Sequence, residues 1–92
     1  MQIDPKRVLV VIPSFKEAAV IASTIAPLLE TGYSVLVVDD GSPDNTGEVL
    51  SALPVSYLRH PVNLGTGAAR ETGMEYARRI NAEYVIHFDA DG

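Results

Sequence analysis

Two apolar runs, residues 8–12 and 34–38, constrain the fold of this chain more than any other feature of its sequence. Both runs are rich in valine, and neither alternates apolar with polar residues. Continuous runs of this kind are typical of strands that are covered on both faces, as in the parallel sheets of α/β proteins. The chain therefore needs helices on both faces of a sheet.

Stretches with helical periodicity alternate with these strands. The spacing of apolar residues predicts a helix that ends near Gly32, and Pro27 inside it predicts a kink or an early stop. The apolar positions of this helix are Val20, Ile21, Ile25, Leu28 and Leu29. Ser14 and Glu17 have the spacing of a capping box at its start, and we expect Pro13 to end the preceding strand.

The remaining elements continue the alternation. We expect a short helix at residues 46–53, a strand at 55–58, a helix at 67–80 and a strand at 84–88. Ninety-two residues allow one domain, spanning residues 1–92. The order βαβαβαβ predicts the α/β class, with a three-layer, Rossmann-like parallel sheet and right-handed crossovers. Ligands of such sheets bind beyond the carboxyl ends of the strands, at a switch in strand order.

The composition excludes several classes of function. The chain has no cysteine, which excludes a disulfide scaffold, a thiolate metal site and a cysteine nucleophile, and which fits a cytoplasmic location. Twelve carboxylates against seven Lys and Arg give a formal charge of −5, which argues against nucleic acid or an anionic membrane surface as the main partner. No apolar run approaches the ~20 residues of a membrane span.

Polar segments follow each expected strand, at residues 13–17, 39–44, 63–70 and 89–91. Because the carboxyl ends of parallel strands lie at one edge of a sheet, we expect these segments to meet there. Five of the twelve carboxylates are aspartates of these segments, and the other seven carboxylates balance the seven cations. These five are Asp39, Asp40, Asp44, Asp89 and Asp91. The acidity is therefore local, as expected of a site that binds a divalent cation.

Asp89 and Asp91 form a D-x-D pair directly after the last expected strand. Two carboxylates two residues apart in extended backbone point the same way, and a shared cation relieves their repulsion. Hard oxygen ligands suit Mg²⁺ or Mn²⁺, which take further ligands from a substrate diphosphate. The alternative is a solvated acidic turn.

The other polar segments each have a structural and a functional interpretation. Asp39 either belongs to a strand-to-turn signal or accepts hydrogen bonds from a nucleobase. Residues 63–70 either begin a glycine-rich helix with a surface arginine, or place Arg70 and a helix N-terminus near a phosphate. They lack a full G-x-G-x-x-G, and no Gly-Lys-Ser/Thr occurs in the chain. A capped helix start explains residues 13–17 without any ligand, and His60 and His87 lack metal-like spacing.

Four stretches together resemble the N-terminal half of inverting glycosyltransferases with the GT-A fold, a large family that includes dolichyl-phosphate mannose synthase and other polyprenyl-phosphate sugar transferases. They are VVIPSFKE at residues 10–17, VVDDGSPDNT at 37–46, NLGTGAAR at 63–70 and FDADG at 88–92. The resemblance covers residues 8–92 and identifies a nucleotide-sugar donor as ligand.

The resemblance also implies a role for each matching residue. Pro13, Phe15 and Glu17 line the nucleotide pocket, and Asp39 binds the base. Gly65 and Arg70 flank the base and diphosphate. Asp89 and Ala90 contact the donor, and Asp89 and Asp91 hold Mg²⁺ or Mn²⁺. In place of the Tyr-Asn that is common in the family, this chain has Phe15 and Lys16.

The resemblance implies a transferase that moves a sugar from a UDP- or GDP-sugar to an acceptor such as a polyprenyl phosphate, with inversion. The acceptor half and the catalytic base are expected outside this chain, so we expect it to bind donor without turnover. The full-length protein is expected at the cytoplasmic face of a membrane. We also expect a homodimer through an exposed sheet edge. The alternative is a non-catalytic binding or assembly module with a vestigial site.

Overall fold

A computed structural model of the chain describes residues 3–88. Its centre is a four-stranded parallel sheet with the strand order β3-β2-β1-β4. The strands are β1 (Val8–Ser14), β2 (Ser34–Asp39), β3 (Ser56–Arg59) and β4 (Tyr84–His87). The helices are α1 (Ile21–Leu29), α2 (Thr46–Leu50) and α3 (Thr66–Arg79), and a short 3₁₀ helix, η1 (Pro5–Arg7), precedes β1. The predicted α/β class and parallel sheet are confirmed.

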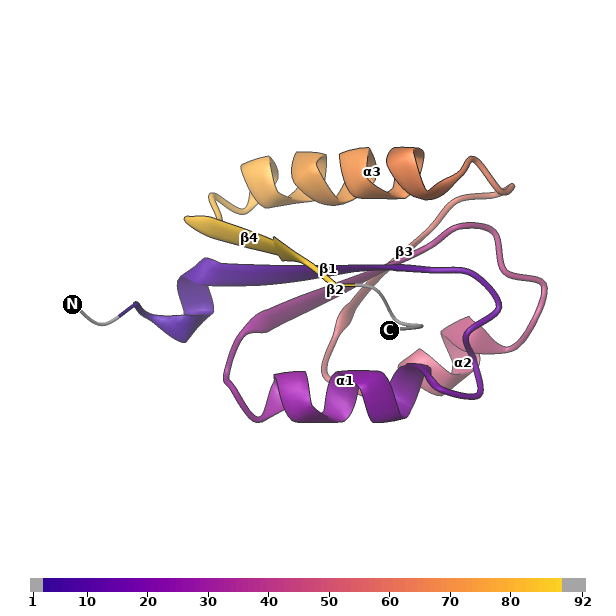
Figure 1. Ribbon diagram of the computed structural model, residues 1–92, viewed down its shortest axis with the longest axis horizontal. Coiled ribbons are helices and arrows are strands. Elements are labelled where there is room, and N and C mark those ends of the chain that lie inside the picture. Colours follow the sequence, from indigo (N-terminus) through magenta and orange to yellow (C-terminus); the bar gives the residue numbers. More distant parts are fainter. Residues whose placement is uncertain (1–2, 89–92) are drawn as a thin grey trace.

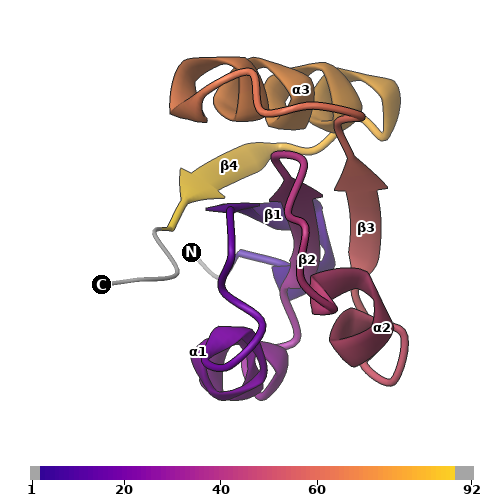
Figure 2. The same cartoon turned by 90° about the vertical axis from the view of Figure 1, so that its right-hand side faces the viewer.

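The helices cover both faces of the sheet, as the unbroken apolar strands require. Figures 1 and 2 show α3 above the sheet and α1 and α2 below it. Alternate strand residues therefore enter two separate cores. Val10, Ile12 and Val37 pack with α1, whereas Val11 and Val38 pack beneath α3. Both apolar runs are buried along almost their whole length.

The register brings the carboxyl ends of three strands together. Ser14 at the end of β1 pairs with Asp39 at the end of β2, and Asp39 pairs with Arg59 at the end of β3. On the other side of β1, pairing with β4 ends at Val11 and His87. The chain thus places β2 and β4 on opposite sides of β1, and the switch in strand order lies between β1 and β4. Ligands of open α/β sheets bind beyond such a switch.

The prediction that Pro13 ends the first strand is wrong, because β1 continues through Pro13 to Ser14. The carbonyl of Val11 accepts from the N–H of Phe88, and the carbonyl of Ser14 accepts from the N–H of Asp40 on the β2 side. Backbone groups alternate along a strand, so the nitrogen of Pro13 faces the β4 side, beyond the last paired residue of β4. The missing N–H therefore interrupts no pairing with β2.

The predicted capping box is also wrong. Ser14 lies inside β1, and α1 begins only at Ile21. The intervening segment is held instead by residues far away in sequence, since Ser42 Oγ accepts from the N–H of Lys16 and Asp44 from that of Ala18. These tertiary hydrogen bonds override the local capping signal.

The other boundaries agree more closely with the sequence. Helix α1 continues two residues past Pro27 and ends at Leu29, before the left-handed Gly32 (φ 81°). Helix α2 ends at Leu50, earlier than the predicted residue 53, because the backbone tightens into a turn in which Leu53 N–H donates to the carbonyl of Leu50. The bounds of β3, α3 and β4 differ from the prediction by one residue. Within the described residues, no helix has the length and apolar character needed to cross a membrane.

Gly73 provides a test of the contact between α3 and β1. A Cβ added at Gly73 would lie 2.4 Å from Val11 Cγ1, whereas one added at Gly67 in the same helix would meet no atom within 4 Å. We expect Gly73→Ala to lower the free energy of unfolding by about 1–3 kcal/mol because it overpacks a core without free volume. Gly67→Ala is the control and should raise it by up to about 1 kcal/mol through helix propensity. Urea denaturation measures both, and equal stability of the two variants would contradict this packing.

Candidate functional site

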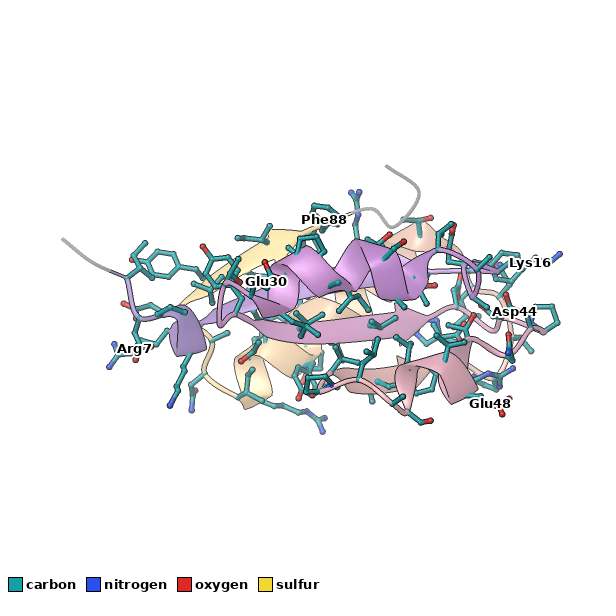
Figure 3. All side chains as sticks on the ribbon, turned by 90° about the horizontal axis from the view of Figure 1, so that it is seen from below. Arg7, Lys16, Glu30, Asp44, Glu48 and Phe88 are labelled. Atoms are coloured by element: carbon teal, nitrogen blue, oxygen red, sulfur yellow. The ribbon has the colours of Figure 1, made fainter. Side chains whose placement is uncertain are left out.

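The loops at the carboxyl ends of β1, β2 and β3 are joined by backbone hydrogen bonds. Asp40 N–H donates to the carbonyl of Ser14 over 2.8 Å, and His60 N–H donates to that of Asp39 over 2.8 Å. Lys16 and Asp44 lie at this end of the molecule, and Arg7 lies at the opposite end (Figure 3). The sheet thus presents one polar edge built from chain-distant loops.

Asp39 is a fixed, buried carboxylate at the centre of this edge, with 1% of its surface exposed. Its Oδ1 accepts from the N–H of Ser42 over 2.9 Å, and its Oδ2 accepts from the hydroxyl of Tyr57. The Arg59 Nε lies 4.0 Å from the same Oδ2. Burial and the bond to Asp39 raise the pKa of Tyr57 to about 12. Because a carboxylate has about four acceptor positions, Asp39 retains capacity for a ligand donor.

Ser42 connects three of the loops. Its Oγ accepts from the N–H of Lys16 over 2.9 Å, and its carbonyl accepts from the guanidinium of Arg59 over 3.2 Å. The backbone of Lys16 is left-handed (φ 57°), and its Nζ lies 5.2 Å from the centre of the Phe15 ring. Phe15 itself is 37% exposed. The segment after β1 therefore offers an aromatic face and a cation to anything bound at this edge.

Asp44 fastens the start of α2 to the same segment. Its Oδ2 accepts from the N–H of Ala18 over 3.3 Å, and its Oδ1 accepts from the N–H and hydroxyl of Thr46. The hydrogen bond from Thr46 leads in holding the pKa of Asp44 below its ordinary value. The ionised Asp44 thus joins the segment after β1 to the start of α2.

Asp40 holds the loop that follows β3. Its Oδ1 accepts from the N–H of Leu64 and lies 2.8 Å from His60 Nδ1, while its Oδ2 accepts from the N–H of Gly65. Burial acts to raise the pKa of this carboxyl, but the bonds from His60, Leu64 and Gly65 together hold it below its ordinary value. The carboxylate is therefore ionised at neutral pH.

Gly41 allows the loop after β2 to contact the loop after β3. Its backbone is left-handed (φ 78°), and a Cβ there would lie 2.7 Å from the carbonyl carbon of Val62 and 2.8 Å from the nitrogen of Asn63. Both the conformation and the space exclude any larger residue.

Helix α3 opens toward the polar edge. Gly65 precedes its first turn with φ 99°, and within residues 3–88 no side chain of the helix cap bonds its first N–H groups. The first N–H groups of a helix and its dipole favour an anion. Arg70 lies one turn further and is exposed.

The structure brings together most of the site residues predicted from the sequence. Pro13, Phe15, Glu17 and Asp39 lie at the ends of β1 and β2, and Gly65 and Arg70 lie at the start of α3. Asp89, Ala90 and Asp91 lie outside the described residues, immediately after Phe88, which follows β4. Between residues 3 and 88, no three metal-ligating side chains cluster.

Sequence reasoning missed several polar residues of this edge. Tyr57 and Arg59 lie in β3 and His60 directly follows it, and the signal that could have revealed them is their place at a strand's carboxyl end. Ser14 was interpreted as a helix cap, yet it is 3% exposed and its Oγ has no hydrogen-bond partner among the described residues.

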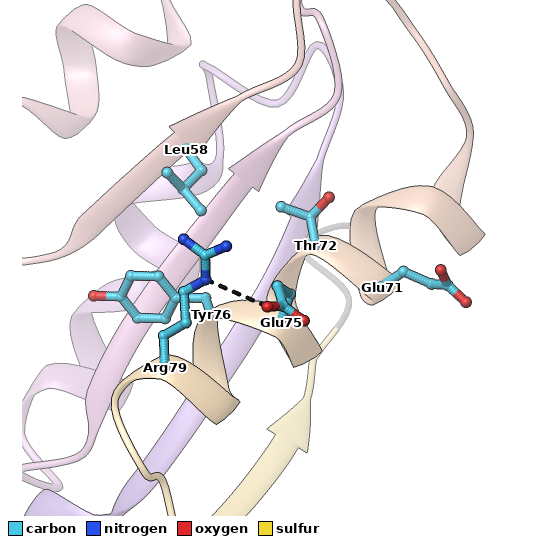
Figure 4. Close-up of a pocket in the computed structure, with 6 residues that line it drawn as sticks. All are labelled: Leu58, Glu71, Thr72, Glu75, Tyr76 and Arg79. Carbon is cyan, nitrogen blue, oxygen red and sulfur yellow. Dashed lines mark hydrogen bonds and ion pairs between the residues drawn. The ribbon is translucent and has the colours of Figure 1, made fainter.

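A separate cavity of about 480 Å³ lies between β3 and α3. Leu58, Glu71, Thr72, Glu75, Tyr76 and Arg79 line it (Figure 4). Glu75 and Arg79 form an ion pair of 3.3 Å across one turn of α3. Thr72 connects this cavity with the polar edge, because its hydroxyl lies 2.8 Å from His60 Nε2.

Similarities to solved structures define the class of fold. A crystal structure of a mycobacterial protein matches 91% of this chain and 31% of its own with 25% identity and a TM-score of 0.73. Glucosyl-3-phosphoglycerate synthase from Mycobacterium tuberculosis, crystallised with Mn²⁺, UDP and phosphoglyceric acid, matches 90% of this chain and 32% of its own, with 26% identity and a TM-score of 0.60. The fold is thus that of the nucleotide-binding part of GT-A glycosyltransferases.

The chain belongs to glycosyl transferase family 2, whose family model matches residues 9–92. An uncharacterized protein of Methanocaldococcus jannaschii is 39% identical over 92 residues, which are 99% of this chain and 38% of that protein. The UDP-N-acetylglucosamine–dolichyl-phosphate N-acetylglucosaminyltransferase of Methanococcus voltae is 30% identical over 95% of this chain and 42% of its own length. The chain thus spans about two fifths of these relatives.

Tyr57 provides a test of how Asp39 is held. Tyr57→Phe should lower the free energy of unfolding by about 1–3 kcal/mol near neutral pH, because the buried carboxylate loses a donor. The raised pKa means that the phenol's contribution is present below its ordinary pKa of about 10 and is lost as the pH rises through about 12. The gap between wild type and variant should therefore narrow over this interval.

Chemical denaturation across the alkaline range measures this gap. Tyr84→Phe is the control, because Tyr84 is 42% exposed on β4. A Tyr57→Phe protein as stable as wild type at every pH would show that the hydroxyl contributes nothing.

Proposed function

We propose that residues 1–92 form the donor-binding half of an inverting, metal-assisted glycosyltransferase. This transferase would move a sugar from a UDP- or GDP-sugar to an acceptor such as a polyprenyl phosphate. One observation carries the proposal: three loops from different strands are bonded into one polar edge beside the switch in strand order. Such an edge is where α/β sheets bind nucleotides.

The side chains of this edge suit the parts of a nucleotide. The Phe15 ring is exposed enough to stack on a base, and Pro13 and Glu17 lie two residues before and after it in the chain. Asp39 is held in one orientation by Ser42 and Tyr57, so that it can accept from a base N–H. Gly65 leaves open space at the start of α3, and Arg70 adds a cation for the diphosphate.

Asp89 and Asp91 are the proposed ligands of Mg²⁺ or Mn²⁺, with Ala90 between them bordering the donor. Because β4 runs parallel to β1, its carboxyl end points to the same edge of the sheet. Two carboxylates are a hard-oxygen donor set of the kind these ions prefer. The ion would stabilise charge that develops on the departing nucleoside diphosphate. The M. tuberculosis synthase, crystallised with Mn²⁺ and UDP, supports this assignment.

The acceptor and the catalytic base belong to the part of the relatives that this chain does not match. The M. voltae relative, whose name includes dolichyl phosphate, supports a lipid-phosphate acceptor. With such an acceptor, the enzyme would work at the cytoplasmic face of a membrane.

Donor binding tests the proposal directly. Wild type should bind a UDP- or GDP-sugar in a Mn²⁺-dependent manner, and Asp91→Ala should weaken this binding by about tenfold or more, because a metal ligand is lost. Isothermal titration of the 92-residue chain measures it. Glu30→Ala is a matched control, since Glu30 is an exposed carboxylate after α1, away from Lys16 (Figure 3). Equal binding by wild type and Asp91→Ala, or none by folded wild type, would overturn the metal site.

Nucleoside diphosphate release with a lipid-phosphate acceptor separates the proposal from a non-catalytic module. We expect residues 1–92 alone to bind donor without release. Turnover by this chain would exclude the module with a vestigial site, and absence of donor binding would favour that module.

Self-association through the sheet edge is a further part of the proposal. Tyr84, Ile86 and Phe88 in and after β4 are 42%, 42% and 39% exposed. Edge strands with exposed apolar side chains pair with other chains. We expect a dimer in sedimentation experiments, and Ile86→Lys should shift it toward monomer. A monomer at high concentration would contradict this expectation.

A further inference from the structure

A buried chain of hydrogen bonds runs from β2 through β3 to α3. His60, at the end of β3, is 9% exposed, and Asp40, after β2, is 5% exposed. His60 Nδ1 lies 2.8 Å from Asp40 Oδ1, and its Nε2 lies 2.8 Å from Thr72 Oγ1. The imidazole therefore joins a carboxylate of one loop to the helix that borders the candidate site.

The partners of the imidazole determine the place of its proton. The carboxylate of Asp40 is ionised and can only accept, so Nδ1 carries the hydrogen. Thr72 can then donate its hydroxyl hydrogen to Nε2. The ring is thus held at both of its nitrogens.

The orientation of Asp40 in turn determines the backbone before α3. With Oδ1 held by His60, Oδ2 faces the N–H of Gly65 over 2.8 Å, and Oδ1 also accepts from the N–H of Leu64. Gly65 is the residue before the first turn of α3, and its carbonyl accepts from Ala69 N–H over 3.1 Å. The direction of the first turn therefore depends on one buried carboxylate.

Asp40 is held by the protein more fully than Asp39 is, so Asp40 is the less suited of the two to bind the nucleotide-sugar donor. The two oxygens of Asp40 have three partners, in His60, Leu64 and Gly65. The two oxygens of Asp39 accept from two groups, in Ser42 and Tyr57. Asp39 faces the opposite side of the sheet, toward Tyr57. The two adjacent aspartates thus have different tasks.

We infer that His60 is a positioning residue: through Asp40 it fixes Leu64, Gly65 and the start of α3 for the diphosphate of the nucleotide. This inference rests on the proposed donor function. The N–H at Nδ1 orients the carboxylate of Asp40, and the hydrogen bond between Nε2 and Thr72 keeps the ring in place.

Two substitutions separate the two nitrogens. His60→Asn places an amide N–H near the position of Nδ1, whereas His60→Gln places its amide near that of Nε2. His60→Gln should weaken UDP or GDP binding by about tenfold, as expected for the loss of a buried bond to a charged group. It should leave the affinity for uridine or guanosine within about twofold, because the first turn of α3 acts on the diphosphate. His60→Asn should retain diphosphate binding within about threefold.

Amide hydrogen exchange tests the same inference without any ligand. Exchange at Leu64 and Gly65 should accelerate by about tenfold in His60→Gln and remain near wild type in His60→Asn. Thr72→Val, which removes the partner of Nε2 but keeps the bulk, should give a smaller change in the same direction. It serves in place of His60→Gln if that variant does not fold.

The outcomes distinguish this inference from the proposed function. If wild type binds neither UDP nor GDP, the donor function fails, and exchange at Gly65 still decides whether His60 holds the loop. If wild type binds a nucleotide but His60→Gln loses nucleoside and diphosphate affinity equally, or behaves as His60→Asn does in both measurements, the positioning role is overturned.

Discussion

Two adjacent buried carboxylates at the end of β2 organise the functional end of this molecule. Asp39 and Asp40 are 1% and 5% exposed, and a buried charge is tolerated only when it is hydrogen-bonded. Because successive strand residues face opposite sides of the sheet, the two carboxylates recruit different partners. Asp39 holds the α1–α2 side through Ser42 and Tyr57, and Asp40 holds the α3 side through His60 and Gly65. The loops converge because these two charges require donors.

The same requirement explains the residues that follow β2. Only glycine at position 41 allows its loop to contact the backbone of Val62 and Asn63. The N–H of Ser42 donates to Asp39, and its hydroxyl oxygen accepts from the N–H of Lys16. The edge is therefore rigid before any ligand arrives. A rigid site loses little conformational entropy on binding, which suits the proposed binding of a flexible nucleotide.

The sequence predicted the arrangement of elements well, because the valine-rich strands and the helical spacing are local signals that agree with the fold. It failed where distant residues decide the structure. Ser14 and Glu17 have the spacing of a capping box, yet the segment is not helical, because its N–H groups donate to Ser42 and Asp44 instead. The pairing of His60 with Asp40 joins residues twenty positions apart, and no periodicity reveals it. The roles proposed for Asp39, Gly65 and Arg70 come from the motifs that surround them and remain predictions.

Pro13 has a consequence for the growth of the sheet. Its nitrogen faces the β4 side, at the position from which β1 would have to donate the next hydrogen bond to β4. Within the described residues, the pairing of β1 with β4 ends at Val11 and His87. The next residue of β1 that faces this side is an imino acid, so the lack of a donor there is fixed by covalent structure and not by side-chain packing.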